Sequence, residues 1–231
     1  MNTHLLQSPN IRLVLNASAM VICLASFYLL MIWATTEGTP KIDEQLLLSL
    51  RENNGSPIGP QWLEEAARDI TALGSITVLI MTTTIAAFAL YFAELKRQAL
   101  ILIAAAALAL SCSMILKQLI DRTRPNLVAH ETRVFTRSFP SAHALNATAI
   151  YLTIATLLSG SARRKRVKIT ALGTGAGLAG AVGISRVYLG VHWPSDVLAG
   201  WLGGAIIALA STQLCLAASN QIMIGGNNEY S

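Results

Sequence analysis

Apolar residues are gathered in six long runs, at about residues 12–35, 74–93, 99–120, 142–160, 169–190 and 195–219. A membrane-spanning helix needs roughly 20 mostly apolar residues, and each run is close to that length. The pattern therefore predicts an all-α, polytopic membrane protein with six transmembrane helices.

The loop at 36–73, between the first two runs, has a pattern of its own. Apolar side chains recur at helical spacing in two stretches, Ile42, Leu46, Leu47, Leu50 and Trp62, Leu63, Ala66, Ala67, Ile70. The break between them contains Gly55, Pro57, Gly59 and Pro60. Such stretches are typical of helices that lie on a membrane surface. We expect a helical outer loop, which is either a packed cap or a lid and entrance for a lipid. The polar tail 221–231 is expected to be unstructured.

Composition excludes an ordinary soluble domain. Hydrophobic residues make up 53% of the 231 positions, charged residues only 13%, and the mean hydropathy is +0.53. We expect residues 1–231 to form a single integral membrane domain, with an uncleaved first span. The net charge of +5 is explained by basic loops facing anionic lipid, or in part by an anionic substrate.

Basic residues in two short loops predict the orientation. The loops at 94–98 and 161–168 are rich in Lys and Arg. With six spans, these loops and both termini share one side, which the positive-inside rule assigns to the cytoplasm. A raw count of Lys and Arg does not decide the orientation, but several of those on the other side belong to the clusters described below. We expect a multi-pass protein of the inner (plasma) membrane, with those clusters facing the periplasm or exterior.

A polar stretch at 185–196 separates the last two runs. His192 and Asp196 are four residues apart, close enough for the carboxylate to hold one imidazole nitrogen and leave the other as base or nucleophile. Arg186 is suited to gripping an oxyanion. Pro194 fits the first turn of a helix, which would place Asp196 in that turn. The alternative is an interfacial loop whose Trp and His lie among lipid headgroups.

Two further clusters precede this stretch. In the first, Lys117 closes the third run, and Arg124 and Pro125 follow, where the proline ends any helix. In the second, Ser141 occupies an N-cap position at the start of an apolar helix, whose free N–H groups form a ready anion site, and His143 stands in the first turn. The alternatives are basic side chains that extend to the membrane surface and an ordinary helix cap.

By the predicted topology, all three clusters lie on one side of the membrane. Together they offer fixed positive charge, helix N–H donors and two histidines. A phosphate monoester carries about −1.5 to −2 charges near neutral pH, and its hydrolysis needs donors, a nucleophile and an acid for the leaving oxygen. These residues could supply all of them.

The three clusters resemble the tripartite signature of the type 2 phosphatidic acid phosphatase (PAP2) superfamily, K-x6-R-P, P-S-G-H and S-R-x5-H-x3-D. They read here as Lys117…Arg124–Pro125, Pro140–Ser141–Ala142–His143 and Ser185–Arg186…His192…Asp196. The departure is Ala142 in place of glycine, which keeps the backbone N–H and adds one methyl group. The six-span layout also resembles the membrane branch of the family.

The resemblance implies a hydrolase that removes phosphate from lipid phosphates or pyrophosphates without a metal or other cofactor. By this resemblance His192 is the nucleophile and forms a phosphohistidine, Asp196 orients it, and His143 is the general acid and base. The implied substrate-binding residues are Lys117, Arg124, Ser141, Ala142 and Arg186. The expected partners are the bilayer and a lipid phosphate at its outer leaflet, with no nucleic acid and no obligate protein partner.

Several alternatives stay open at this point. The same residues would serve a lipid phosphotransferase or a lipid A phosphatase, and an anion or lipid transporter is a non-enzymatic alternative. The substrate class includes phosphatidic acid, phosphatidylglycerol phosphate and undecaprenyl pyrophosphate. Arg122, Arg133 and Arg137 either recognise a second phosphate or meet anionic headgroups.

Overall fold

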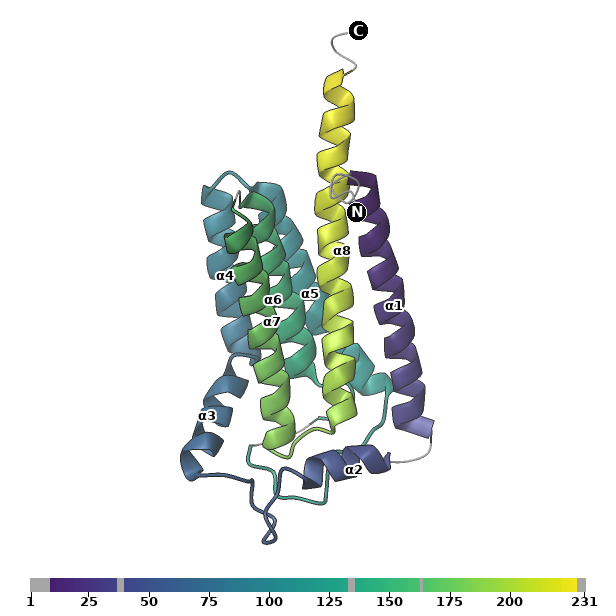
Figure 1. The fold of residues 1–231 in the computed structure, drawn as a ribbon, viewed down its shortest axis with the longest axis vertical. Helices are drawn as coiled ribbons and strands as arrows, with labels where there is room; N and C mark the ends of the chain where they lie inside the picture. The colour runs from purple at the N-terminus through teal and green to yellow at the C-terminus, as the bar shows by residue number, and fades with distance from the viewer. Residues whose placement is uncertain (1–8, 37–39, 133–135, 163, 228–231) are drawn as a thin grey trace.

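The computed structural model describes the chain except residues 1–8, 37–39, 133–135, 163 and 228–231 (Figure 1). Every regular element in this described part is an α-helix, and one isolated antiparallel bridge joins Arg51 to Pro57. The helices are α1 (Pro9–Thr36), α2 (Lys41–Leu48), α3 (Gln61–Ala72), α4 (Ile76–Phe92), α5 (Lys96–Leu119), α6 (Ala142–Ser161), α7 (Lys165–Tyr188) and α8 (Pro194–Asn227). The predicted all-α fold is confirmed, and each apolar run coincides with most of one helix.

Five helices, α1, α5, α6, α7 and α8, are each long and apolar enough to cross a membrane. Helix α4 has 17 residues and passes the same test only together with α3, from which it is bent by 52°. The described residues therefore provide five spans, or six if the bent pair is counted as one. The bend lies at Gly74, where an added Cβ would come within 2.5 Å of Val182 and 3.2 Å of His143.

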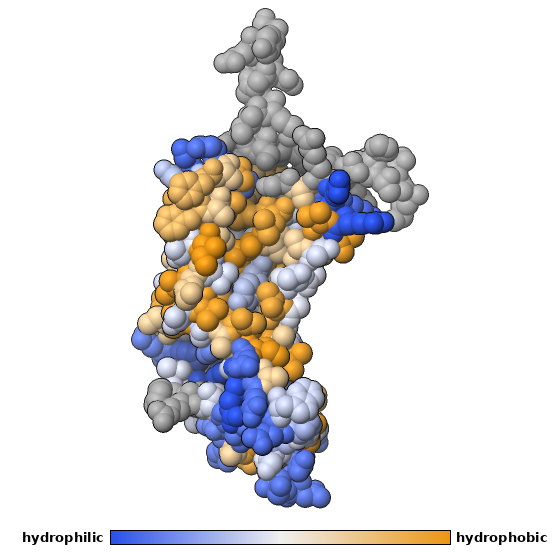
Figure 2. Space-filling model, turned by 90° about the vertical axis from the view of Figure 1, so that its left-hand side faces the viewer, coloured by the Kyte–Doolittle hydropathy of each residue, from blue (hydrophilic) through white to orange (hydrophobic). Residues whose placement is uncertain are grey.

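Polar and apolar surfaces are separated along the length of the bundle. Helices α2 and α3 and the loops after α5 and α7 lie at one end, and the α4–α5 turn and the start of α1 lie at the other (Figure 1). Figure 2 shows an apolar band between the two ends, with hydrophilic residues gathered at the end that carries α3. This band is what a bilayer would cover.

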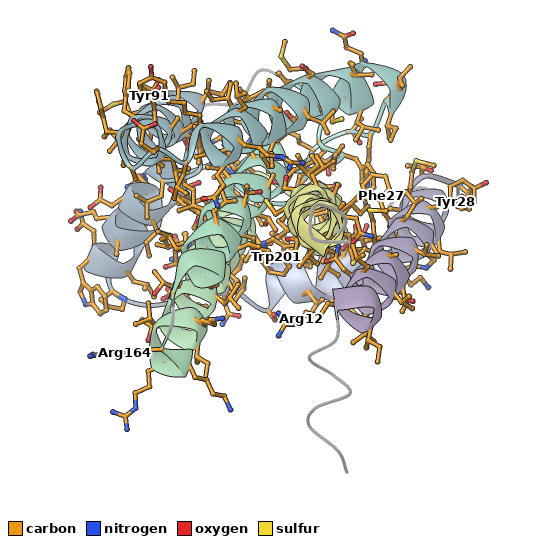
Figure 3. The ribbon with its side chains drawn as sticks, turned by 90° about the horizontal axis from the view of Figure 1, so that it is seen from above. Arg12, Phe27, Tyr28, Tyr91, Arg164 and Trp201 are labelled. Carbon is orange, nitrogen blue, oxygen red and sulfur yellow. The ribbon has the colours of Figure 1, made fainter. Side chains whose placement is uncertain are left out.

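Helix α6 lies at the centre of the bundle and α1 lies at its periphery. The most apolar window of α6 is 67% buried within the protein, whereas that of α1 is 0% buried. Helix α1 lies along α8 (Figure 3), with Phe27 against a cluster that includes Phe139 while Tyr28 points outward.

Four glycines allow helices α6, α7 and α8 to approach closely. A Cβ at Gly200 would lie 2.7 Å from the Ser141 carbonyl oxygen, and one at Gly204 would lie 2.5 Å from that of Leu145. Gly175 meets the Tyr151 backbone and Gly183 meets the ring of Trp201 in the same way. Small residues at these positions let the helix backbones approach closely. Three other glycines of α7 face open space instead: Gly173, Gly177 and Gly180.

The loop after α1 forms the two predicted short helices, α2 and α3, joined by a turn through Gly55. Leu63 and Ala67 of α3 pack against Tyr188, Leu189 and Val191 at the end of α7. The packed-cap interpretation of this loop therefore describes α3 well. The prediction for the C-terminal tail is wrong over 221–227, because α8 continues to Asn227, and 228–231 lie outside the described residues.

Candidate active site

The start of α8 positions the pair at the centre of the site. Pro194 is the first residue of α8 and Asp196 lies in its first turn, as the sequence predicts. The Asp196 carboxylate accepts the backbone N–H of Trp193 at 3.0 Å, which is how an acidic residue at this position commonly closes the start of a helix. The same oxygen, Oδ2, lies 3.3 Å from Nδ1 of His192. The helix start thereby fixes the spacing of the carboxylate and the imidazole.

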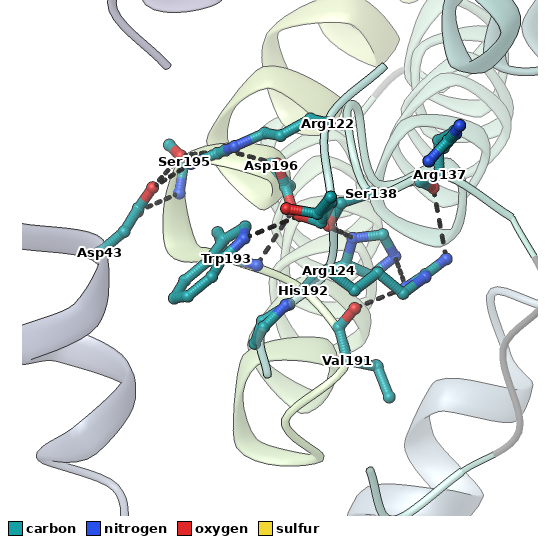
Figure 4. Close-up of polar contacts among 12 residues, drawn as sticks. Asp43, Arg122, Arg124, Arg137, Ser138, Val191, His192, Trp193, Ser195 and Asp196 are labelled. Atoms are coloured by element: carbon teal, nitrogen blue, oxygen red, sulfur yellow. Dashed lines mark hydrogen bonds and ion pairs between the residues drawn. The ribbon is translucent and has the colours of Figure 1, made fainter. Parts of the chain in front are cut away.

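Both side chains of this pair are removed from solvent. His192 is 1% exposed and Asp196 is 0% exposed. Ser138 donates its hydroxyl to Oδ2 of Asp196 and also lies 3.4 Å from Nδ1 of His192. A buried carboxylate with several donors is held in one orientation, so the ring that faces it is held as well (Figure 4).

The other imidazole nitrogen faces a guanidinium. Nη1 of Arg124 lies 3.2 Å from Nε2 of His192 and donates to the carbonyl of Val191. Nε of Arg124 donates to the carbonyl of Thr136 at 2.7 Å. These backbone acceptors fix Arg124 beside Nε2, where an oxygen of a phosphoryl group bound to that nitrogen would be within its reach.

Positive charge converges on His192 from separate elements. Burial is the largest of the causes that hold the pKa of His192 well below its usual value, and the charges of Arg124, Arg186 and Lys117 and the ring of His143 lower it further. The charges act together because all of them surround one ring. Four residues from three separate sequence clusters are thus brought to one place. They come from α5, from the loop that follows it, from α6 and from α7.

The start of α6 contributes donors to the same place. Ser141 is its N-cap residue, as predicted, but its side chain makes no capping hydrogen bond. Its Oγ is buried without a hydrogen-bond partner among the described residues. The Ser141 N–H donates to the Asp196 carbonyl at 3.0 Å, and the next amides, which include that of Ala142, lack partners within the helix, as at any helix start. The hydroxyl and these amides are free for an anion.

Arg186 and Lys117 each donate a hydrogen bond to a residue that lies outside the three sequence motifs. Nη1 of Arg186 donates to Thr71 of α3 at 3.0 Å, while its buried Nε has no partner in the described part of the chain. Lys117, in the last turn of α5, donates to the carbonyl of Arg137. An unpartnered buried guanidinium nitrogen carries a large desolvation cost, which a bound anion would relieve.

The structure corrects the two interpretations of Arg122. Its guanidinium is buried and binds two carboxylates, Asp196 through Nη1 at 2.6 Å and Asp43 of α2 through Nη2 at 2.7 Å. It is therefore occupied, and it meets neither a second phosphate nor headgroups. Arg137 is exposed and pairs with Asp121, and Arg133 lies outside the described residues.

Sequence reasoning missed Asp43, Ser138 and Ser195 as parts of the site. Asp43 is 1% exposed and accepts both the N–H and the hydroxyl of Ser195. In the sequence it is an ordinary acidic residue on the polar side of a short amphipathic helix, 153 positions before Asp196. No motif marks it, because its contacts arise only when α2 folds back onto α8.

Comparison with known proteins agrees with this geometry. A profile of the PAP2 superfamily matches residues 98–218, more than half of the chain and all three polar clusters. The chain belongs to the PAP2 superfamily. It is 34% identical over 153 residues to phosphatidylglycerophosphatase B of Bacillus subtilis, a match that covers 63% of this chain and 72% of that protein.

Two further relatives support membership in this superfamily. The crystal structure of a transmembrane PAP2-type phosphatidylglycerolphosphate phosphatase from Bacillus subtilis superposes with a TM-score of 0.77 at 28% identity, covering 84% of this chain and 94% of that one. Decaprenylphosphoryl-5-phosphoribose phosphatase of Mycobacterium tuberculosis is 37% identical over 115 residues, 48% of this chain and 58% of that protein. All of these relatives are phosphatases by name, which favours the predicted enzyme over the transporter.

Proposed function

We propose that this chain, a membrane lipid phosphatase of the PAP2 superfamily, releases phosphate through a phosphohistidine at His192. The observation that carries the proposal is the setting of that ring, with Nδ1 against Asp196 and Nε2 beside Arg124. A nucleophile needs one free nitrogen and a partner for the charge that develops on the other. Asp196 lies 3.3 Å from Nδ1 and is the partner for that charge, and Nε2, which is 3.2 Å from Arg124, is the nucleophilic nitrogen.

In this mechanism, Nε2 of His192 attacks phosphorus and the bond to the lipid oxygen breaks. His143 gives a proton to the leaving oxygen, then takes one from the water that attacks the phosphohistidine and releases inorganic phosphate. Asp196 stabilises the imidazolium through Nδ1–H. The second half-step regenerates the neutral ring, so atoms and charge balance over the cycle.

The phosphoryl oxygens would be held by Arg124, Arg186, Lys117, the Ser141 hydroxyl and the Ala142 amide. The buried atoms without partners, Oγ of Ser141 and Nε of Arg186, support this assignment. Stabilising charge on the equatorial oxygens is the main task in phosphoryl transfer. Arg124, Arg186 and Lys117 would supply that charge, so we propose that turnover needs no metal ion.

We further propose that the whole chain is one domain, that the site faces the periplasm or exterior, and that the phosphate is carried by a glycerophospholipid or a polyprenyl chain. The names of the relatives include one of each kind, a phosphatidylglycerophosphatase and a decaprenylphosphoryl-phosphoribose phosphatase. The active-site groups lie at the ends of the spans, where the headgroups of a surrounding bilayer would be.

The test is phosphate release from a panel of lipid phosphates in detergent by the purified enzyme and by His192→Ala. We expect the variant to fold and to lose turnover, EDTA to have no effect, and vanadate, which mimics pentacoordinate phosphorus, to inhibit. After acid-free quenching, the wild-type protein should carry base-stable, acid-labile phosphate. Loss of activity in EDTA, or an active His192→Ala protein, contradicts the mechanism.

A further inference from the structure

The buried contacts of Asp43 reach the catalytic pair through a single guanidinium. Arg122 binds Asp43 with Nη2 and Asp196 with Nη1, at 2.7 and 2.6 Å. Nη1 also donates to the hydroxyl of Ser195 at 2.7 Å. The side chains of the three charged residues are 2%, 6% and 0% exposed. Asp43 comes from α2, which the three sequence motifs do not include (Figure 4).

Asp43 also closes the start of α8. Its Oδ1 accepts the backbone N–H of Ser195 at 2.9 Å, and its Oδ2 accepts the Ser195 hydroxyl. The first N–H groups of a helix have no partner within it, and an acidic group there stabilises the helix start. Asp43, a residue of α2, thus caps the first turn of α8, and that turn also contains Asp196.

The charges of Asp43, Arg122 and Asp196 do not cancel, and the excess is negative. Two carboxylates share one guanidinium, so one negative charge is left over beside Nδ1 of His192. If Arg122 paired with Asp196 alone, it would neutralise the carboxylate that the imidazolium needs. Asp43 draws the guanidinium toward itself, so Asp196 keeps more of its negative potential for the ring.

We propose that Asp43, acting through Arg122 and Ser195, is a positioning residue for the reaction: it fixes the first turn of α8 and keeps Asp196 able to stabilise the imidazolium of His192. Asp43 does not touch the substrate. The inference rests on the proposed role of His192. It implies that turnover requires α2 to be packed against the start of α8.

The experiment compares Asp43→Asn, Arg122→Gln and the double variant, assayed with dioctanoyl phosphatidic acid in detergent and normalised to folded protein from gel filtration. Asp43→Asn should lower kcat by about tenfold or more while KM stays within about threefold, because only the transition-state charge is affected. Arg122→Gln should lower kcat further, since it leaves two buried carboxylates without a counter-ion. Adding Asp43→Asn to it should then restore kcat by about tenfold, because one uncompensated charge is removed.

The matched control is Asp69→Asn, the same change at an exposed residue of α3, which should leave kcat and KM unchanged. If Asp43→Asn does not fold, Asp43→Glu carries the test, with the same expected fall in kcat at constant KM. A normal kcat in a folded Asp43 variant overturns the proposal. So do independent effects of the two substitutions, because a residue that acts through Arg122 must be coupled to it.

His192→Ala is assayed in parallel to separate this inference from the proposed function. An active His192→Ala protein removes the proposed function and this inference together. An inactive His192→Ala protein with a normal Asp43→Asn protein removes only the role of Asp43.

Discussion

At the scale of single residues, His192 has two distinct environments on its two nitrogens. Nδ1 faces a carboxylate whose charge is shared with Arg122, and Nε2 faces Arg124. Burial and the surrounding cations lower the pKa of the ring well below the usual value for histidine. The positive field that would bind a phosphate therefore also keeps the nucleophilic nitrogen unprotonated in the free enzyme.

Because its pKa is lowered by burial and by the neighbouring cations, His192 should be harder to protonate than free histidine. Because the folded-state pKa is lowered, the ring should keep its lone pair through the range near 6.5 in which free histidine takes up a proton. The unfolded chain binds that proton and the folded chain does not, so the contribution of His192 to stability falls as pH drops below about 6.5. Nitrogen NMR of histidine-labelled protein, assigned with His192→Asn, checks the protonation state. A His192 signal that titrates with a midpoint near 6.5 contradicts this prediction.

The residues of the site were predictable from the sequence only where they repeat a motif. The spacing of His192 and Asp196 implied their contact, and the helix start at Pro194 implied its geometry. Ser138 and Asp43 reach Asp196 or its turn from 58 and 153 positions away, through tertiary packing that no local pattern encodes. Arg122 was noticed, yet its role was not predicted, because its two acceptors come together only in the folded protein.

At the scale of elements, the site depends on how closely α8 lies against α6. The Ser141 N–H donates to the Asp196 carbonyl, so the two helix starts are joined by a hydrogen bond. Gly200, one turn after Asp196 in α8, leaves room for this, since its missing Cβ would meet the Ser141 carbonyl at 2.7 Å and the Ala144 methyl at 2.8 Å. Anion donors of α6 and the catalytic pair of α8 are thereby held together.

Gly200→Ala should therefore reduce both stability and activity. The added methyl meets backbone that cannot move cheaply, and overpacking of this kind costs about 1–3 kcal/mol. Displacement of α8 from α6 should also lower kcat. The control is Gly177→Ala, where an added Cβ meets nothing within 4 Å and alanine is the better helix former. Thermal unfolding in detergent and specific activity are the measurements, and equal shifts in the two variants would argue against this packing role.

The hydropathy pattern predicted the helices well, including α2 and α3, because both lengths and faces are visible in it. It did not show that α4 has only 17 residues or that the chain bends by 52° before it. At the bend, Gly74 lies so close to α6 and α7 that an added Cβ would meet His143 and Val182. It likewise gave no indication that α8 continues through the polar tail to Asn227.

At the scale of the whole molecule, the site lies at one end of the bundle, with α2 and α3 over it, and the basic loop before α5 lies at the other (Figure 1). Since basic loops are retained in the cytoplasm, both termini should be cytoplasmic and the site should face outward. Reporter fusions after residues 96, 130 and 165 check this. A cytoplasmic signal at residue 130 would show the opposite orientation.

The end of the bundle that carries the site also exposes large apolar side chains on its two short helices. Ile42 and Leu46 of α2 are 52% and 48% exposed, and Trp62 of α3 is 65% exposed. Such side chains are stable at a membrane surface, and there they would keep the site level with lipid headgroups. A lipid could then present its phosphate to Arg124 and His192 while its chains stay in the bilayer.

This placement predicts a preference for a lipid phosphate over a soluble phosphomonoester. Burial of a lipid chain is worth roughly 0.8 kcal/mol per CH₂ when the chain leaves water, but a lipid already in the membrane gains little of that on binding. The preference should therefore come from local concentration and positioning. We expect kcat/KM for a diacyl or polyprenyl phosphate to exceed that for glycerol phosphate in the same micelles. Equal values would contradict a role of the membrane in presenting the substrate. They would not bear on the chemistry at His192, which the His192→Ala variant tests separately.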